Sequence, residues 1–501
     1  MRACPPCPKR SHNQVIQEFS NGRTPESLVE TLRQTSRSHG AEGIVLLRTS
    51  SFDSPSARYS LVAANPFLTF RSFGSHCAIM SPGSGSLCHI QFGNPWQLLE
   101  SLMSRFELLD AVEQPFPLGG CFGFWGYDLK NFTEPKLPRR AEADLELPDC
   151  HVAFYDSLVV FDHQLNKTFI VSNGLSADGS RTEARARRQA EVWAEMLRRT
   201  VAEGADRRFQ RAGARTTVAS NFSRTDFIAA VARAQDHIRL GEIYQVNLSQ
   251  RLTAESGMSG WELFERLTAV SPAPFSAFLD CGDFQIVSSS PEQFLQMSGR
   301  RIATRPIKGT RPRGADAIQD AQLAHELQIS AKEQAELLMI TDLMRNDLGR
   351  ICEFGSVRTP ELARLERFAQ VQHLVSTVEG RLKNDVTHPA ALASCFPGGS
   401  ITGAPKFRAM QVIDELEPIT RGPYCGCHGY LGFNRQSQLS VTIRTAIRAD
   451  GRIHFNVGAG VVADSDPEAE YEETLAKAAG FLAALDADVL AEGMAMEKRA
   501  V

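Results

Sequence analysis

Two pairs of glutamates have a spacing that suits a metal site on facing helices. Glu333 and Glu336 are three residues apart in one predicted helix, and Glu470 and Glu473 are three apart in another. Residues at this spacing share one helix face. Many such pairs only face solvent, but Glu336 precedes the apolar run 337–340 and so lies near the apolar side of its helix. Two pairs facing each other would form an oxygen-rich site suited to Mg²⁺, which keeps waters and can share an anionic substrate.

Lys308 is a candidate nucleophile. It stands between the apolar Ile307 and Gly309, in a segment with turn character. An amine whose stem lies in apolar surroundings loses proton affinity and can attack an electrophile. A solvent-exposed loop lysine without chemistry is the alternative that the local sequence leaves open.

Two glycine-rich segments resemble nucleotide-binding loops but lack their key residues. Segment 398–403 has the glycine spacing of a P-loop, yet Ala404 and Pro405 stand where lysine and serine or threonine are required. Segment 458–463 fits the dinucleotide pattern without the βαβ unit that should follow it. We therefore expect close backbone approach to an anion, such as a carboxylate at a helix start, rather than nucleotide binding.

Composition narrows the class of protein. The 501 residues are 43% hydrophobic and 22% charged, with a net charge of −4. A dedicated nucleic-acid binder is usually strongly basic, and no apolar run approaches the roughly 20 residues that span a bilayer. The first thirteen residues contain no apolar segment of the secretory type. These features predict no nucleic-acid partner and no membrane association.

Cysteine usage predicts a reducing compartment. Eleven cysteines, an odd number, are scattered without a repeated spacing, which is typical of reduced thiols in a cytoplasmic protein. Cys4 and Cys7 form a lone C-x-x-C pair with no second pair at zinc spacing. Cys121 lies in a Gly-Cys-Phe-Gly turn that lacks a nucleophile's surrounding pattern, so we expect it to pack in the interior.

The elements that must position these residues are mixed along the chain. Apolar and β-branched runs predict strands at 43–47, 59–63, 157–161, 244–248, 284–288, 440–447 and 453–457. Helical spacing predicts helices at 177–202 with Val192 on the apolar side, from a Ser223 cap to 241, at 316–348, at 405–416, and from an Asp466 cap onward. Because strands and helices do not alternate strictly, we expect an α+β fold with large antiparallel sheets and outer helices.

A polar, aperiodic stretch at 203–220 predicts a domain boundary. It divides the chain into an N-terminal domain over 1–215 and a catalytic domain over 216–490, followed by a tail over 491–501.

The order of the motifs resembles that of the chorismate-binding enzymes. Similarity is continuous over 221–485 and extends to the Gly-rich aromatic segment 115–127. It is carried by segments 241–248, 290–295, 306–310, 335–336, 345–349, 373–375, 396–406, 421–424, 443–445, 458–460 and 470–474.

Within that family the chain most resembles aminodeoxychorismate synthase component I. Anthranilate synthases carry alanine at the position of Lys308, and isochorismate and salicylate synthases carry lysine at the position of Gln245. The resemblance implies amination of chorismate at C4, on the path to p-aminobenzoate and folate. Anthranilate synthase component I, which aminates at C2 and releases pyruvate, is the nearest alternative, and a catalytically silent scaffolding member is another.

The resemblance also implies roles for individual residues. Lys308 would attack the ring at C2 while Glu292 protonates the departing C4 hydroxyl, after which ammonia adds at C4 and expels the lysine. Glu336 and Glu473 would hold Mg²⁺ with Glu333 and Glu470 in support, and Arg444 and Tyr424 would bind a substrate carboxylate or its enolpyruvyl arm. Further implied substrate-binding residues are Gln245, Thr310, His373, Thr402, Gly403, Gly458, Gly460 and Lys477.

Two further expectations follow from the resemblance. A separate glutamine amidotransferase should dock and pass ammonia to the site, because the chain shows no glutaminase signature. Anthranilate synthases that bind tryptophan usually carry Leu-Leu-Glu-Ser, whereas this chain has Arg48 and Thr49 after Leu46 and Leu47. The resemblance therefore does not imply regulation by tryptophan.

Overall fold

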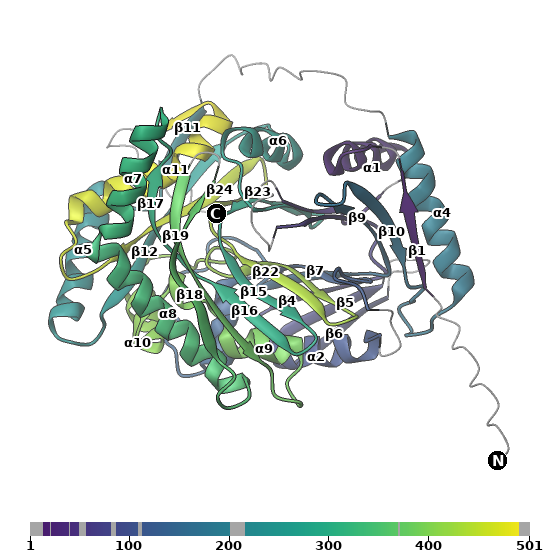
Figure 1. Cartoon of the computed structure of the whole chain (residues 1–501), viewed down its shortest axis with the longest axis horizontal. Helices are drawn as coiled ribbons and strands as arrows, with labels where there is room; N and C mark the ends of the chain where they lie inside the picture. Colours follow the sequence, from purple (N-terminus) through teal and green to yellow (C-terminus); the bar gives the residue numbers. More distant parts are fainter. Residues whose placement is uncertain are drawn as a thin grey trace.

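Two large β-sheets form the framework of the molecule (Figure 1). The computed structural model describes residues 14–20, 22–39, 41–49, 57–81, 87–108, 113–200, 216–368 and 371–489. Within these residues the strands of both sheets pair antiparallel, except for the parallel pair β11–β25. The α+β fold with outer helices is confirmed.

The first sheet has thirteen strands. In spatial order they are β1 (Val15–Phe19), β10 (Lys167–Ser172), β9 (Ser157–Asp162), β3 (Tyr59–Ala63), β2 (Val45–Arg48), β13 (Phe275–Asp280), β14 (Phe284–Ser290), β23 (Thr445–Ala449), β24 (Arg452–Val461), β12 (Gln245–Glu255), β11 (Thr216–Ser220) and β25 (Ala487–Val489), with β20 (Gly403–Ala404) paired to β12.

The second sheet has twelve strands. Their order is β17 (Ile307–Pro312), β19 (Val371–Arg381), β16 (Arg301–Arg305), β15 (Gln293–Ser298), β22 (Gln436–Val441), β21 (Cys427–Gly432), β7 (Gly120–Trp125), β8 (Cys150–Tyr155), β4 (Leu68–Phe73), β5 (His76–Ser81) and β6 (Leu87–Phe92), with β18 (Arg358–Arg367) paired to β19.

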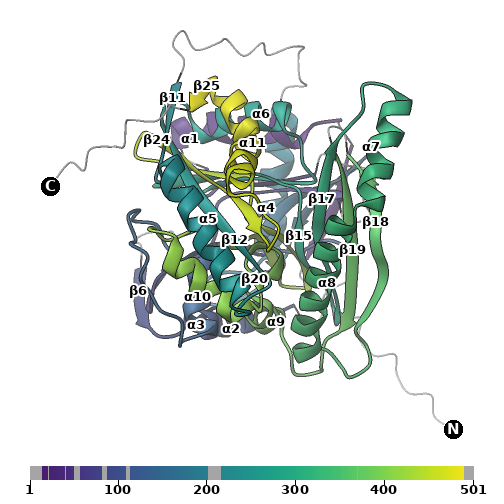
Figure 2. The same ribbon diagram turned by 90° about the vertical axis from the view of Figure 1, so that its left-hand side faces the viewer.

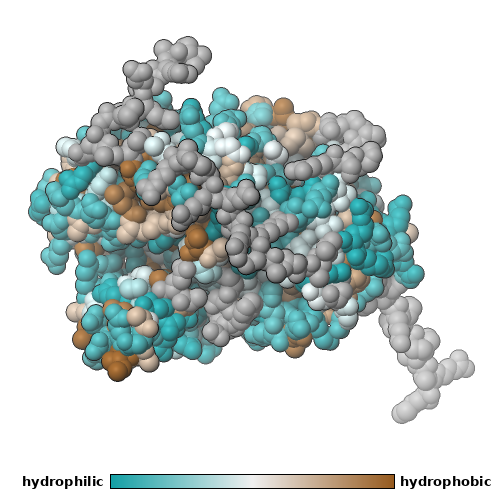
Figure 3. All heavy atoms as spheres, turned by 90° about the horizontal axis from the view of Figure 1, so that it is seen from above, coloured by the Kyte–Doolittle hydropathy of each residue, from teal (hydrophilic) through white to brown (hydrophobic). Residues whose placement is uncertain are grey.

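Helices lie around the two sheets (Figures 1 and 2). They are α1 (Pro25–His39), α2 (Pro95–Phe106), α3 (Lys130–Thr133), α4 (Glu183–Arg199), α5 (Arg224–Arg239), α6 (Gly260–Val270), α7 (Ala317–Ile329), α8 (Ala331–Ile351), α9 (His388–Cys395), α10 (Lys406–Leu416) and α11 (Pro467–Leu485), with short 3₁₀ turns at Tyr127–Leu129 and Gly399–Ile401. No helix in the described part of the chain is long and apolar enough to cross a membrane. The face in Figure 3 is mostly hydrophilic, with small groups of apolar atoms.

Several predicted elements are confirmed and others need correction. The Ser223 and Asp466 side chains cap α5 and α11 by accepting backbone N–H bonds. The helix predicted at 316–348 is wrong as a single element, because it breaks at Ser330, whose side chain caps α8. The strand predicted at 440–447 is interrupted by Arg444, which has a φ of 50°.

Helix α4 also differs from its prediction. It is shorter than predicted, and it buries Trp193 and Leu197 while Val192 is exposed. The prediction from large hydrophobic residues placed the buried face of α4 wrongly, because most residues of the buried face are alanines.

The last five residues of the predicted boundary segment 203–220, Thr216–Ser220, form β11 and pair with β12. The rest of that segment, the tail at 491–501 and the Cys4–Cys7 pair lie outside the described residues. Both sheets combine strands from before and after position 215. The division into 1–215 and 216–490 stays a prediction.

Candidate active site

Lys308 lies where β17 of one sheet approaches β24 of the other. A Cβ placed on Gly460 of β24 would lie 2.7 Å from Gln245 Nε2 and 3.7 Å from Lys308 Nζ. Glycine at this position therefore leaves room between the two sheets for the lysine and the glutamine. Gln245 is 2% exposed, and its Oε1 has no hydrogen-bond partner, so the site contains a buried acceptor without a partner.

Glu292 is buried beside Lys308, in the turn between β14 and β15. Burial raises the pKa of Glu292 to about 7, although hydrogen bonds from Ser400 and from the backbone N–H of Ile307, and the nearby charge of Lys308, act in the opposite direction. A carboxyl with such a pKa carries a proton for a large part of the time near neutral pH. It can therefore serve as a general acid.

The two glutamate pairs face this position from α8 and α11. Burial raises the pKa of Glu336, and the charges of Glu333 and Glu473 add to the effect. The pKa of Glu473 is lowered: burial acts to raise it, but the Lys477 ammonium, 2.6 Å from Glu473 Oε1, outweighs burial. The structure thus brings carboxylates from both helices within electrostatic reach of Lys308.

Glu470 has an oxygen available for a further ligand. Its side chain is 5% exposed, Ser465 donates to Oε1 at 2.6 Å, and Oε2 has no partner. Burial raises the pKa of this carboxyl. Glu333 packs against Gly309, where a Cβ would lie 3.0 Å from Glu333 Oε2.

This donor set fits a hard divalent cation in its chemistry. It provides carboxylate oxygens from two helices and one orphaned buried oxygen. Within the described residues, no three acidic, histidine or cysteine side chains lie close enough to hold a metal as they stand. The residues suited to Mg²⁺ are therefore near one another without forming a preassembled cage.

Arg444 is within electrostatic reach of Tyr424 and of Glu473 on α11. Arg444 occupies the interruption between β22 and β23, and burial lowers the pKa of its guanidinium. The Tyr424 hydroxyl is close to Gly458, where a Cβ would lie 2.8 Å from it. Lys477 donates to the Gly458 carbonyl at 2.8 Å. A buried cation beside a glycine-lined surface is suited to a substrate carboxylate.

His373 and Thr310 are neighbours across β17 and β19. The Thr310 hydroxyl lies 3.0 Å from His373 Nδ1, and burial lowers the pKa of His373 to about 4. The imidazole is therefore neutral near pH 7 and can accept or donate a single hydrogen bond through each nitrogen.

The 402–403 segment contributes its backbone to the site. Thr402 is fully buried, and its hydroxyl donates to the Gly398 carbonyl at 3.0 Å. Gly403 pairs with β12, and a Cβ there would lie 2.2 Å from the Gln245 carbonyl oxygen. Most of the predicted site residues thus lie on β12, β17, β20, β24, α8 and α11.

The sequence analysis assigned no role to a buried ion pair under this site. Arg421 donates to Glu417 Oε1 at 2.7 Å and also to the carbonyls of Asn247 and Ile401. Its guanidinium lies 5.8 Å from the centre of the Tyr424 ring. The i, i+4 spacing of Glu417 and Arg421 could have predicted that the two side chains form an ion pair, but not that this ion pair is buried.

Ser400 and Lys332 were missed as well. Ser400 hydrogen-bonds Glu292, and the charge of Lys332 acts to lower the pKa values of Glu336, Glu470 and Glu473, although burial still raises those of Glu336 and Glu470. The position of Lys332 directly before Glu333 was a usable signal for its place near the glutamates. No local pattern indicates the contact between Ser400 and Glu292, because this contact joins distant segments of the chain.

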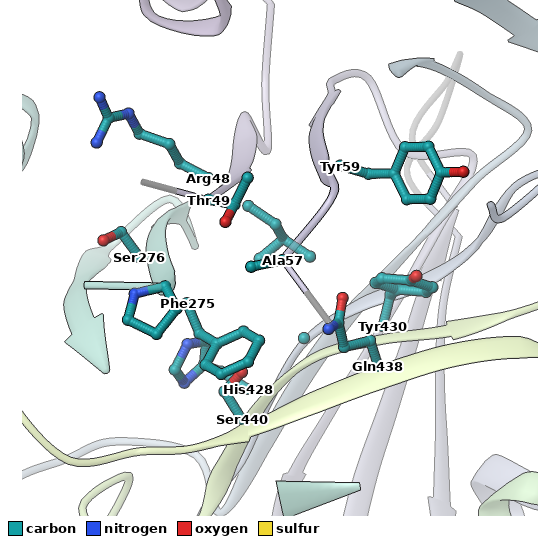
Figure 4. Close-up of a pocket in the computed structure, with 13 residues that line it drawn as sticks. Arg48, Thr49, Ala57, Tyr59, Phe275, Ser276, His428, Tyr430, Gln438 and Ser440 are labelled. Atoms are coloured by element: carbon teal, nitrogen blue, oxygen red, sulfur yellow. The ribbon is translucent and has the colours of Figure 1, made fainter. Parts of the chain in front are cut away.

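A separate small cavity lies between the sheets, near Arg48 (Figure 4). Among the described residues it is lined by Thr49 and Tyr59 on one side and by His428, Gln438 and Ser440 on the other, with a volume of about 30 Å³. The Arg48 guanidinium points away from the β22 residues (Figure 4) and forms an ion pair with Glu26.

Cys121 has the packing role that the sequence predicts. Its thiol is fully buried in β7, and burial raises its pKa strongly. A thiol in this state is a poor nucleophile.

Comparison with known proteins shows the family of the chain. The family model for chorismate binding enzyme matches residues 51–483. The chain is 37% identical over 477 residues to anthranilate synthase component 1 of Acetivibrio thermocellus, covering 94% of each chain. It is 38% identical over 443 residues to aminodeoxychorismate synthase component 1 of Escherichia coli (strain K12), covering 88% of this chain and 93% of the relative.

A solved structure is also similar. The crystal structure of anthranilate synthase component I from Streptococcus pneumoniae TIGR4 superimposes with a TM-score of 0.73 at 32% identity, covering 85% of this chain and 93% of that one. The match over most of the sequence, together with these identities, shows that the chain belongs to the chorismate-binding enzyme family.

Proposed function

We propose that this enzyme aminates chorismate at C4 to give 4-amino-4-deoxychorismate, the precursor of p-aminobenzoate for folate synthesis in the cytoplasm. The observation that carries the proposal is the pairing of Lys308 with the buried Glu292, whose pKa is raised to about 7. An amine nucleophile beside a protonated carboxyl is the arrangement that displacement of a ring hydroxyl needs.

The steps follow from the chain's own residues. The Lys308 amine forms a bond to C2, both ring double bonds shift by one position, and the C4–O bond breaks. The proton of Glu292 goes to the departing hydroxyl, which leaves as water. Ammonia then bonds to C4, both double bonds shift back, and the C2–N bond breaks to release the lysine, while the new C4 ammonium group returns a proton to Glu292.

Binding would use charges on both sides of the ring. Arg444 and Tyr424 would hold a carboxylate of the dianionic substrate, while the Gly458 and Gly460 backbone allows close approach. Glu336 and Glu473, supported by Glu333 and Glu470, would hold Mg²⁺. When bound, the cation would supply positive charge opposite the ring carboxylate.

Ammonia would come from a separate glutamine amidotransferase. The matched relatives are named as component 1, which supports a second component for this chain. Only neutral ammonia can attack C4, and free ammonia is mostly protonated to ammonium at neutral pH. We expect the purified chain to use ammonium at raised pH and to use glutamine only when the amidotransferase is added.

Anthranilate synthase component I is the second candidate, because a relative with that name covers 94% of the chain at 37% identity. Incubation with chorismate, Mg²⁺ and ammonium separates the two. Our proposal expects 4-amino-4-deoxychorismate without pyruvate. Anthranilate fluorescence with equimolar pyruvate would replace it with the second candidate.

A further inference from the structure

Ser465 connects the turn after β24 with the first turn of α11. Its hydroxyl donates to Glu470 Oε1 at 2.6 Å and accepts a hydrogen bond from the backbone N–H of Val462 at 3.0 Å. A serine hydroxyl has one proton to donate and two lone pairs that accept. The Val462 N–H occupies a lone pair, so the single proton of the hydroxyl remains for the carboxylate. The direction of the bond to Glu470 is therefore fixed.

This contact makes the two oxygens of Glu470 unequal. Oε1 is satisfied by Ser465, whereas Oε2 is buried without a hydrogen-bond partner in a residue that is 5% exposed. A buried carboxylate oxygen without a partner is costly unless a ligand supplies the missing donor or positive charge. Glu473 lies three residues further along α11, on the same face of the helix. The free oxygen of Glu470 therefore indicates a ligand beside the other glutamates.

The segment that carries Ser465 is itself held in place from α5. Gln235 Nε2 donates to the carbonyls of Ala463 and Ser465 at 3.2 and 2.7 Å, and the Ser465 N–H donates to the Val462 carbonyl at 3.1 Å. Gln235 and Ser465 are 8% and 7% exposed, so water competes little for these bonds. Ser465 thus has a fixed position from which to orient the carboxylate.

A separate network holds α11 itself. Gln250 of β12 donates to the Thr474 hydroxyl at 2.7 Å, and this hydroxyl donates to the Tyr471 carbonyl at 2.7 Å. Thr474 is fully buried. The position of the helix and the orientation of the Glu470 carboxylate therefore depend on different hydroxyl groups, which substitutions can remove one at a time.

We propose that Ser465 is a positioning residue for the metal site, which fixes the Glu470 carboxylate so that Oε2 stays free for Mg²⁺ or for a water bound to it; this rests on the Mg²⁺ site of the function proposed above. Residues that hydrogen-bond metal-binding groups orient them, and their loss typically lowers metal affinity by about 10- to 100-fold. Ser465 acts through Glu470 and not on the substrate.

The test measures metal binding directly. Mn²⁺, which prefers oxygen ligands as Mg²⁺ does, is titrated into the purified chain without chorismate, and the free ion is followed by electron paramagnetic resonance. The rise in Tm on adding Mg²⁺ is a second measurement, because a ligand of the folded state stabilises it. Ser465→Ala removes the hydroxyl and Ser465→Thr keeps one. Thr474→Val is the matched control, because it removes a buried hydroxyl from α11 and leaves the bond between Ser465 and Glu470 intact.

We expect Ser465→Ala to bind Mn²⁺ at least about tenfold more weakly than the parent and to lose most of the rise in Tm that Mg²⁺ causes. Ser465→Thr should restore most of the Mn²⁺ affinity, because the threonine hydroxyl can donate the same bond. Thr474→Val should lower the Tm of the metal-free chain, since Gln250 loses its acceptor, but should keep the parent's Mn²⁺ affinity.

Equal Mn²⁺ affinity in Ser465→Ala and the parent would overturn the positioning role. So would an equal loss of affinity in Thr474→Val, which would assign the effect to loosening of α11 as a whole, and so would a parent chain that binds no Mn²⁺. Formation of anthranilate and pyruvate by the parent would instead overturn the proposed function, and the Mn²⁺ affinities would still decide the role of Ser465.

Discussion

Glu292 differs from an ordinary surface glutamate because it is 5% exposed and burial raises its pKa to about 7. Proton donation is most effective when the pKa of the donor lies near the working pH. The residue can thus hold a proton that Glu473, whose pKa is lowered, cannot hold at the same pH. The structure thus separates two kinds of carboxyl group, one that carries a proton for part of the time near neutral pH and one that remains charged.

This difference predicts a pH dependence. With the concentration of neutral ammonia held constant, kcat/KM should fall as pH rises through about 7, because the acid form of Glu292 is lost. Glu292→Gln should lower the rate by about 10²-fold or more and abolish that limb of the pH profile. A variant that kept the parent's profile would contradict the role of Glu292 as the acid.

Stability provides a second measurement on the same residue. Because the pKa of Glu292 is raised from 4.5 to about 7 by burial, the folded state binds more protons than the unfolded state between these values. The stabilising contribution is complete below about pH 4.5 and is lost as pH rises to about 7. Glu292→Gln should flatten this part of the pH dependence of the free energy of unfolding.

Lys308 is the residue on which the covalent route depends. Lys308→Ala should reduce amination by more than about hundredfold while the fold persists, since a change at a partly exposed side chain usually alters stability by about 0.5 kcal/mol or less. Denaturation during turnover followed by mass spectrometry should find a chorismate-derived adduct on the parent peptide.

The control is Lys167→Ala, at a lysine that is 42% exposed and pairs with Glu18 far from the site in sequence. It should keep the parent rate. Equal rates in Lys308→Ala and the parent would contradict a covalent intermediate.

At the scale of elements, α8 and α11 carry the glutamates of the candidate metal site. Glu336→Gln and Glu473→Gln should each remove most activity, because a hard cation loses one of few charged ligands. Each variant should also need a higher Mg²⁺ concentration to reach half of its own maximal residual activity. Glu472→Gln is a matched control on α11, since this residue is exposed beside Glu473. Near-normal turnover at low Mg²⁺ in either test variant would contradict the assignment.

The helices were more predictable from sequence than their ends and breaks. The spacing of Glu333 and Glu336 placed both on one face of a helix, and the Asp466 cap located the start of α11. The break at Ser330 also has a local signal, since Ser330 and Glu333 have the spacing of a capping box. Helical periodicity on both sides of it concealed that signal.

Other features have no local signal because they depend on distant parts of the chain. Arg444 adopts a φ of 50° between β22 and β23, and its position follows from the pairing of these strands in different sheets. The burial that raises the pKa of Glu292 depends on Ser400 and Ile307, which belong to other segments. The resemblance proposes residues for the site, but the local sequence cannot give their protonation.

At the scale of the whole molecule, the active site and the cavity near Arg48 are different places between the same two sheets. Strands β2 and β13, which flank that cavity, belong to the sheet that also contains β24 and Gly460. A ligand in the cavity would therefore contact the framework of the site. Whether tryptophan can be such a ligand depends on the volume of the cavity and on the charge of the side chains that line it.

We expect tryptophan to leave activity unchanged. The cavity offers about 30 Å³ among the described residues, roughly enough for two waters and too little for an indole ring. Its Arg48 is a cation paired with Glu26 and cannot accept a hydrogen bond from a ligand ammonium group. Millimolar tryptophan should therefore give no calorimetric binding signal and no more than about a twofold change in ammonium-dependent rate. Saturable binding with inhibition would contradict this prediction and would require Arg48 and its neighbours to open a larger cavity. In that case Arg48→Glu should strengthen tryptophan binding, because the carboxylate would supply an acceptor for the ammonium group of tryptophan.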